Sequence, residues 1–219
     1  MRTVVYIDGF NLYYSLLRRT NLKWLDVVTL FRDHVLGSNA QVTQVCYYTA
    51  PVLARMSDDP QSVQRQRIYL QALRKMYPDQ LRIVEGRISV TTPFQRLVEP
   101  ISGAPQISRV QVYDFNEKKT DVSLATDLLA GAWTSAFEQA VICSNDTDLE
   151  PALAALRRYH PHLRLGLVAP VKTSDSRHIA ADLRKHADWS KTLSPVHLAN
   201  AQLPERIPAS SLYRPDAWK

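Results

Sequence analysis

Short apolar runs alternate with longer stretches of helical periodicity along most of the chain. Amphipathic stretches at residues 65–77 and 121–136 predict the two longest helices. The apolar runs that predict strands are TVVYID, QVTQVCYYTA, LRIVEGRISV, QAVICS and LRLGLVAP. Such alternation is typical of a parallel sheet flanked by helices. The pattern therefore predicts an α/β fold with a mostly parallel sheet.

Two segments depart from this alternation. Between the third and fourth predicted strands, two alternating runs are separated by residues rich in proline and glycine, which predicts an excursion at the sheet edge over about residues 88–114. After about Ser190 the sequence has four prolines and little periodicity, so we expect an extended C-terminal tail over residues 191–219. We expect one domain over residues 1–190, with the tail packed on it.

Composition excludes several classes of protein. A chain of 219 residues suits one α/β domain, and its 45% hydrophobic and 22% charged residues are near the averages for globular proteins. Its apolar runs are far shorter than the roughly 20 residues that span a bilayer. The N-terminus has no signal-peptide pattern, so we expect a cytoplasmic protein. The two cysteines, Cys46 and Cys143, lie in apolar runs that favour buried free thiols over a disulfide or zinc framework.

The net charge is positive. A formal charge of +6 and an isoelectric point near 9.4 favour polyanionic partners such as nucleic acid. A solvated basic surface explains the same numbers equally well, so the charge becomes informative only beside a site that uses it.

Acidic residues follow two of the predicted strands. Asp8 comes after the first strand, Asp146 and Asp148 come after the fourth, and Asp121 begins a helix. Ligands of open α/β sheets bind beyond the carboxyl ends of the strands, where we expect these side chains to converge. Crowded carboxylates repel one another, and a hard divalent cation such as Mg²⁺ or Mn²⁺ relieves that repulsion. Oxygen ligands without histidine or cysteine disfavour zinc, and phosphodiester hydrolysis is the chemistry that such a site supports.

Each aspartate taken alone has a simpler explanation. Asp8 suits a helix N-cap or a turn, and Asp146 suits an Asx-turn. Asp148 and Asp121 are favourable charges at helix N-termini, with Thr120 as a cap for the second helix. The metal-site hypothesis therefore depends on all four side chains lying together.

Three segments carry a resemblance to a known family. IDGFNLYYSL, KKTDVSLATDLL and VICSNDTDLEPAL resemble the motifs of the NYN domain, a PIN-like nuclease family that includes the LabA-like (DUF88) bacterial proteins. The motifs occur in the family order from Val4 to about Asp188, although Asn145 stands where the family commonly has glycine. The resemblance implies a three-layer α/β/α, PIN-like Rossmannoid fold and a metal-dependent endoribonuclease.

The resemblance also assigns roles to single residues. The implied metal ligands or water activators are Asp8, Asp121, Asp146 and Asp148. Asn11 is expected to orient a ligand or bind phosphate, and Ser144 and Asn145 to offer hydrogen bonds either to the residues that hold the metal or to substrate; alternatively, the last two only form the turn that ends the strand. Asp127 matches a recurrent position. However, six residues from Asp121 is about 120° around a helix, so we expect it to be a helper at most.

Basic and aromatic residues are candidates for binding RNA. Lys118 and Lys119 precede Asp121 and are placed to hold a phosphate, and phosphate contacts are also predicted for Arg65, Arg67, Arg74, Lys75, Arg87, Lys172 and Arg177. Stacking on unpaired bases, which favours single-stranded RNA, is predicted for the Tyr13–Tyr14 and Tyr47–Tyr48 pairs. At least two of these rings are expected in the core instead.

Two rival functions share the acidic site. One is an RNA-binding regulatory module with weak or no cleavage, which acts through partner proteins. The other is a metal-dependent phosphatase for small phosphate esters, although the DxDxT motif of the haloacid dehalogenase type is absent at Asp8. A homo-oligomer or a regulatory protein partner is left open.

Overall fold

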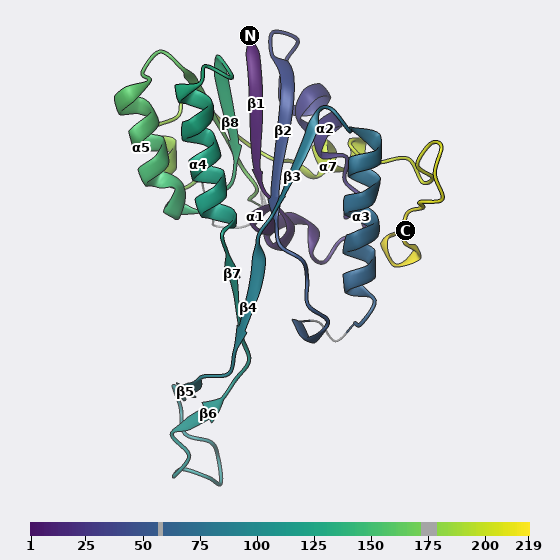
Figure 1. Ribbon diagram of the computed structural model, residues 1–219. Coiled ribbons are helices and arrows are strands. Elements are labelled where there is room, and N and C mark those ends of the chain that lie inside the picture. Colours follow the sequence, from purple (N-terminus) through teal and green to yellow (C-terminus); the bar gives the residue numbers. More distant parts are fainter. Residues whose placement is uncertain (57–58, 172–178) are drawn as a thin grey trace.

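A six-stranded parallel sheet forms the centre of the molecule (Figure 1). The structure is a computed structural model, and it describes residues 1–56, 59–171 and 179–219. The strands lie in the order β10-β9-β8-β1-β2-β3, and all neighbouring pairs are parallel. Their bounds are β1 Arg2–Asp8, β2 Gln41–Thr49, β3 Leu81–Glu85, β8 Gln139–Cys143, β9 Arg164–Ala169 and β10 Trp189–Thr192. The predicted α/β sheet is confirmed.

Helices cover both faces of the sheet, which confirms the three-layer α/β/α arrangement (Figure 1). One face carries α4 (Thr120–Trp133), α5 (Glu150–Tyr159) and α6 (Ala181–Arg184). The other face carries α1 Gly9–Leu12, η1 Tyr13–Leu17, α2 Val27–Thr29, η2 Leu30–Val35, α3 Ser62–Met76 and α7 Pro195–Asn200. The described chain also has three short 3₁₀ turns: η3 Ala54–Met56, η4 Thr147–Leu149 and η5 Asp216–Trp218.

Strand β1 lies at the middle of the sheet and is buried on both faces. Val5 and Ile7 pack in the core under α3, whereas Val4 and Tyr6 pack in the core under α4 and α5. Successive side chains of a strand point to opposite faces, so an almost continuous apolar run is required where both faces are covered. This explains why β1 reads as one apolar run.

Residues 81–90 do not form the single strand that the sequence pattern predicts. It divides at Gly86, after which β4 (Arg87–Thr91) leaves the sheet and pairs antiparallel with β7 (Asp114–Lys118). A Cβ atom at Gly86 would lie 2.6 Å from the Lys118 carbonyl oxygen, so only glycine permits this crossing. A second pair, β5 (Phe94–Arg96) with β6 (Arg109–Gln111), extends the ribbon away from the sheet (Figure 1).

The C-terminal part has more regular structure than its sequence pattern predicts. β10 continues to Thr192, and α7 begins with a capping box in which Ser194 and His197 satisfy each other's backbone N–H groups. Beyond α7, the Leu203 N–H donates to the Trp24 carbonyl at 2.9 Å, and the Trp24 indole N–H donates to the Pro204 carbonyl at 2.9 Å. These bonds hold the end of the chain against its beginning.

The strand order reverses between β1 and β8. From β1 the chain proceeds outward through β2 and β3, and then returns to the other side of β1 to form β8, β9 and β10. Ligands bind at such a reversal, in the crevice beyond the carboxyl ends of the strands.

Both cysteines are free and buried. Within the described ranges, no helix is both long and apolar enough to cross a membrane.

Candidate active site

Asp8 is the last residue of β1 and is held where the strand order reverses. Only 6% of its surface is exposed. Its Oδ1 accepts a hydrogen bond from the Asn11 backbone N–H at 2.9 Å, and its Oδ2 accepts one from Ser144 Oγ, after β8, at 2.8 Å. The second bond joins positions 136 residues apart, so the expected meeting of the β1 and β8 ends is observed.

Two asparagines lock the loops around Asp8. Asn11 Oδ1 accepts from the Asn145 backbone N–H at 3.1 Å, and Asn145 Oδ1 accepts from the Ala180 backbone N–H at 2.8 Å. Buried backbone N–H groups need such partners. The amide oxygens of both side chains therefore position the loops that carry Asp8 and Asp146.

The capping alternatives considered for Asp8 and Asp146 are also realised, whereas Thr120 does not cap α4, because Lys119 holds the N-cap position and no side chain caps it. Asp8 is the N-cap of α1, and Asp146 is the N-cap of η4, where its Oδ1 accepts from the Asp148 backbone N–H at 3.0 Å. A carboxylate has about four acceptor positions, so one or two capping bonds leave others for a cation. The cap and the candidate ligand are thus the same side chain.

The carboxylates interact electrostatically across the site. Burial raises the pKa of Asp8 to about 6, and the charges of Asp121 and Asp146 add to this rise against the hydrogen bonds from Asn11 and Ser144. Burial also raises the pKa of Asp121, at the start of α4, with further contributions from Asp146 and Asp148. The native fold thus holds these like charges close enough to disfavour one another. Asp148 is the exposed member of the set.

A fifth carboxylate belongs to the site and is missing from the residues predicted from sequence. Burial raises the pKa of Glu117 to about 7, and the charges of Asp121 and Asp8 raise it further, whereas a hydrogen bond from Thr120 Oγ1 opposes the shift. Glu117 lies on β7, so the ribbon returns it to the sheet edge. No spacing in the sequence marks this position, because it depends on where an antiparallel ribbon closes.

Predicted phosphate-binding residues surround this edge. Arg87 and Lys118 are directly paired across the base of the β4–β7 ribbon, and both are exposed. Lys119 follows with φ 83°, a left-handed conformation that is uncommon outside glycine, and is also exposed. Lys118 and Lys119 follow Glu117 directly and precede Asp121 by three and two residues, and Arg87 lies opposite Lys118 in the ribbon.

The other predicted binding residues lie elsewhere. Arg65 on α3 forms an ion pair with Asp59, and only 14% of its side chain is exposed. Arg74 pairs with Glu85, and Lys172 and Arg177 lie outside the described residues. The Tyr47 and Tyr48 rings point into opposite cores, as expected for neighbouring strand residues, and Tyr14 is 48% exposed.

Comparison with known families identifies the chain. The NYN domain model matches residues 2–189, almost the entire sheet with its helices. The chain belongs to the NYN domain family. This membership places it in the PIN-like nuclease superfamily, as its three motifs predict.

Two individual proteins resemble this NYN protein over most of its length. A curated relative, 6-hydroxy-3-succinoylpyridine 3-monooxygenase HspA from Pseudomonas putida, is 34% identical over 237 residues, which cover 100% of this chain and 75% of the relative. A crystal structure of a protein of unknown function from Vibrio parahaemolyticus is 14% identical, with a TM-score of 0.48 and coverage of 89% of this chain and 93% of that one.

Asp127 of the NYN domain lies away from the other carboxylates. It accepts hydrogen bonds from Tyr48 Oη at 2.7 Å and from the Arg82 guanidinium at 2.5 Å. An aspartate that is paired in this way joins α4 to strands β2 and β3. The role of Asp127 in this structure is therefore to hold α4 against the sheet.

The donor chemistry of the NYN site fits a hard cation, although its side chains are spread. In the described part of the chain, no three His, Cys, Asp or Glu side chains are grouped as a metal site. Mg²⁺ commonly binds through one or two carboxylates, several waters and substrate phosphates, so a closed protein cage is not required. Asp8 and Asp146, whose loops are joined through Ser144, are the residues that would hold such an ion.

Proposed function

We propose that this NYN protein is an endoribonuclease that hydrolyses RNA phosphodiester bonds with Mg²⁺ or Mn²⁺. The observation that carries the proposal is the buried Asp8 at the strand reversal, with its pKa raised beside Asp121 and Asp146. Mutual repulsion among these carboxylates is the property that a divalent cation would relieve. The family membership supports hydrolysis of phosphodiesters in particular.

Each residue of the site has a defined task in this proposal. Asp8 and Asp146 would hold the cation, which polarises the phosphodiester and lowers the pKa of a bound water. Asp121 and Asp148 would bind its water ligands, and Asn11, Ser144 and Asn145 would keep the loops in register. Glu117 would add negative charge on the ribbon side of the site.

The cations at the ribbon base would position the RNA. Arg87, Lys118 and Lys119 are exposed beside the carboxylates and would contact phosphates that flank the scissile bond. Such contacts carry no sequence information, so we expect weak sequence preference. Single-stranded RNA is the expected substrate, because exposed Tyr14 is available for stacking with unpaired bases. The cytoplasm is the expected site of action.

One experiment tests the proposal. The purified protein is incubated with labelled single-stranded RNA, duplex RNA, single-stranded DNA and p-nitrophenyl phosphate, with Mn²⁺, Mg²⁺ or EDTA. We expect metal-dependent cleavage of single-stranded RNA, lost in Asp146→Asn and kept in Asp182→Asn, which changes an aspartate of α6 outside the site. Cleavage that persists in EDTA or in Asp146→Asn would overturn the metal site.

The same assay separates the rival functions. Hydrolysis of p-nitrophenyl phosphate without RNA cleavage would indicate a phosphatase. Binding of RNA without cleavage under every metal condition would indicate a regulatory module.

A second candidate function comes from the curated relative. Its printed name describes oxygenation of a substituted pyridine, and its match extends over 100% of this chain at 34% identity. A monooxygenase inserts one atom of O₂ into its substrate and needs two electrons from a reductant. Incubating the protein with 6-hydroxy-3-succinoylpyridine, reduced nicotinamide and O₂ tests this candidate. Oxygen uptake that requires both the pyridine and the protein would favour it over the nuclease.

A further inference from the structure

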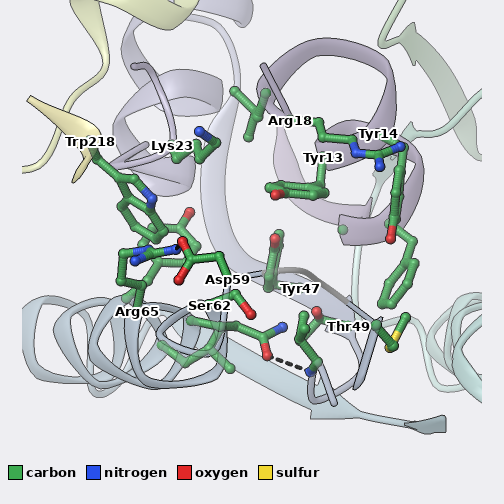
Figure 2. Close-up of a pocket in the computed structure, with 18 residues that line it drawn as sticks. Tyr13, Tyr14, Arg18, Lys23, Tyr47, Thr49, Asp59, Ser62, Arg65 and Trp218 are labelled. Atoms are coloured by element: carbon green, nitrogen blue, oxygen red, sulfur yellow. Dashed lines mark hydrogen bonds and ion pairs between the residues drawn. The ribbon is translucent and has the colours of Figure 1, made fainter. Parts of the chain in front are cut away.

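A cavity of about 340 Å³ lies beside the acidic site, on the α3 face of the sheet (Figure 2). It is partly open to solvent and is lined by residues of α1, η1, β2, η3 and α3, and Trp218 of η5 forms one wall. Its lining is aromatic, with Phe10, Tyr13, Tyr14, Tyr47, Tyr69 and Trp218 among the residues that surround it. Cavities that bind small molecules commonly have about 300–1,000 Å³ and a mostly apolar lining, so this volume suits one ring system with its substituents.

Tyr47 presents an unpartnered hydroxyl in this cavity. Tyr47 is only 6% exposed, and its hydroxyl forms no hydrogen bond with the part of the chain that the structure describes. The ring points from β2 towards Tyr13 (Figure 2). By contrast, the Tyr69 hydroxyl donates to the Leu25 carbonyl at 2.8 Å. The Tyr47 hydroxyl is open to the cavity and can donate one hydrogen bond, so it is placed to bond a polar atom of a ligand.

Two of the cations that line the cavity, Lys23 and Arg65, lie on the side of Trp218, whereas Arg18 lies on the side of Tyr14 (Figure 2). Lys23 and Arg65 lie close enough that the Arg65 charge, after burial, lowers the pKa of Lys23. Arg65 is paired with Asp59, whereas Lys23 Nζ donates to a neutral acceptor, the Thr20 carbonyl, at 2.8 Å. Arg18 adds a third positive charge over the Tyr14 ring. Among the described residues, three cations and one carboxylate thus line the cavity, and a bound anion would balance the surplus of positive charge.

We propose that this cavity binds one planar aromatic ring that carries an anionic group. The ring lies among the tyrosines, where aromatic faces favour stacked or edge contacts. Its anionic group faces Lys23 and Arg65, and the Tyr47 hydroxyl donates a hydrogen bond to a polar atom of the ligand. A nucleotide unit and a free aromatic carboxylate share this chemistry.

The cavity adjoins the acidic site through two elements. Gly9 and Phe10, which line it, directly follow Asp8 in the chain, and the Asp8 charge contributes to the raised pKa of Tyr47. Gly9 permits this closeness, because a Cβ atom there would lie 2.8 Å from the Tyr47 ring and 2.6 Å from the Tyr48 carbonyl oxygen. The cavity therefore borders the end of β1 that carries Asp8, although Asp8 itself is not among the lining residues. The binding itself does not depend on RNA cleavage.

Calorimetry in EDTA tests the proposal apart from catalysis. The probes are AMP and UMP for a nucleotide, nicotinate and benzoate for a free acid, and adenosine, uridine, nicotinamide and benzamide as their uncharged counterparts. We expect one anionic class to bind at 1:1 stoichiometry and its uncharged counterparts to bind at least tenfold more weakly. Mononucleotide binding would identify a nucleotide subsite, and carboxylate binding would identify a pocket for a free aromatic acid. Failure of both anionic classes to bind would overturn the proposal.

Matched variants locate the binding. Tyr47→Phe removes the unpartnered hydroxyl and keeps the ring, so we expect about fivefold weaker binding, equivalent to one neutral hydrogen bond, with the thermal midpoint unchanged or raised. Lys23→Met should weaken anion binding about tenfold. Tyr159→Phe on α5 and Lys75→Met on α3, which lie outside the cavity lining, are the controls. Affinity that is the same in both cavity variants as in the controls would place the ligand elsewhere and refute the assignment.

Discussion

At the scale of single residues, Asp8 shows that a cap and a functional carboxylate need not be alternatives. Its side chain starts α1 and accepts from Ser144, yet it remains buried beside other carboxylates. Two hydrogen bonds lower its pKa, but burial raises it more, so the balance leaves a carboxyl that titrates at about pH 6. A residue required only as a cap would gain nothing from such surroundings. The placement of Asp8 therefore favours a role with a bound cation.

The first prediction concerns stability and pH. The native pKa of Asp8 is above its usual 3.8, so the bound proton stabilises the fold fully below pH 3.8, and this stabilisation is lost as the pH rises through about 6. Asp8→Asn stays uncharged. In EDTA we expect it to raise the free energy of unfolding at pH 8, relative to wild type, by about 1–3 kcal/mol, and to change it little at pH 4. Urea unfolding at both pH values measures the difference.

The control for this prediction is Asp33→Asn. Asp33 is paired with Arg32 at the surface, and its hydrogen bond with Arg32 lowers its pKa, so its replacement should not stabilise the protein at pH 8. Mn²⁺ should stabilise the wild type and not Asp8→Asn. An equal gain for Asp8→Asn at pH 4 and pH 8 would contradict the electrostatic explanation.

The predictability of the site differs between its residues. Asp8 and Asp146 are recognisable from sequence because each lies at or just beyond the end of an apolar strand, and parallel strands bring such positions to one edge. Glu117 is not recognisable, because its place depends on the register of β4 with β7. For Tyr47, the sequence predicts only that its ring and the Tyr48 ring point to opposite faces of the strand. The lack of a partner for the Tyr47 hydroxyl depends on the packing of η1 and α3 against β2.

At the scale of elements, the ribbon of β4 and β7 connects the edge of the sheet to the site. The periodicity of residues 81–90 predicts one strand, and this prediction is wrong at Gly86. The apolar alternation continues through Gly86 although the backbone changes direction there. The ribbon then ends at Lys118, and Lys119 turns the chain into α4 with φ 83°. A non-glycine residue in this conformation stores strain of about 1 kcal/mol. The lysine in this strained position lies between Glu117 and Asp121 in the chain, where its charge can serve a bound phosphate.

The second prediction separates strain from function at this turn. Lys119→Gly removes the left-handed strain, so the free energy of unfolding should rise by about 0.5–1 kcal/mol, while RNA cleavage should fall through loss of a phosphate contact. Ala209→Gly is the matched control, because Ala209 also has a positive φ, 51°, in the C-terminal segment. It should give a similar stability gain with unchanged cleavage. If Lys119→Gly gains stability and cleaves RNA as wild type does, Lys119 has no role in substrate binding.

At the scale of the whole molecule, the end of the chain completes the core under α3. Trp218 packs on Trp24 and Tyr69, with ring centroids 6.3 and 6.1 Å away, and it is 8% exposed. Arg214 bonds to the carbonyls of Asn21 and Trp218, which fastens this turn to the N-terminal half. The proline-rich sequence of this segment does not reveal that one aromatic anchor makes it part of the fold.

The third prediction tests this anchor. Trp218→Ala removes a buried ring, so we expect the free energy of unfolding to fall by about 3 kcal/mol and binding of the ring-shaped ligand to weaken. RNA cleavage below the unfolding transition should persist, because the carboxylates lie on other elements. Trp133→Ala, at a position 58% exposed on α4, is the control and should change stability by less than about 1 kcal/mol. Equal losses in the two variants would show that the tail is not part of the core.

The fourth prediction tests where the net charge of +6 is used. RNA binding that neutralises phosphates releases counterions, and each contact to a single strand contributes about −0.7 to the slope of log K against log salt. Contacts from Arg87, Lys118 and Lys119 should therefore contribute about −2. We expect a variant with glutamine at all three positions to lose this part of the slope, measured in EDTA with a short single-stranded RNA. The control replaces Arg96 and Arg109, which are paired and exposed at the far end of the ribbon. If replacing Arg96 and Arg109 makes the slope less steep and replacing the other three does not, the RNA follows the ribbon outward and not the acidic edge of the sheet.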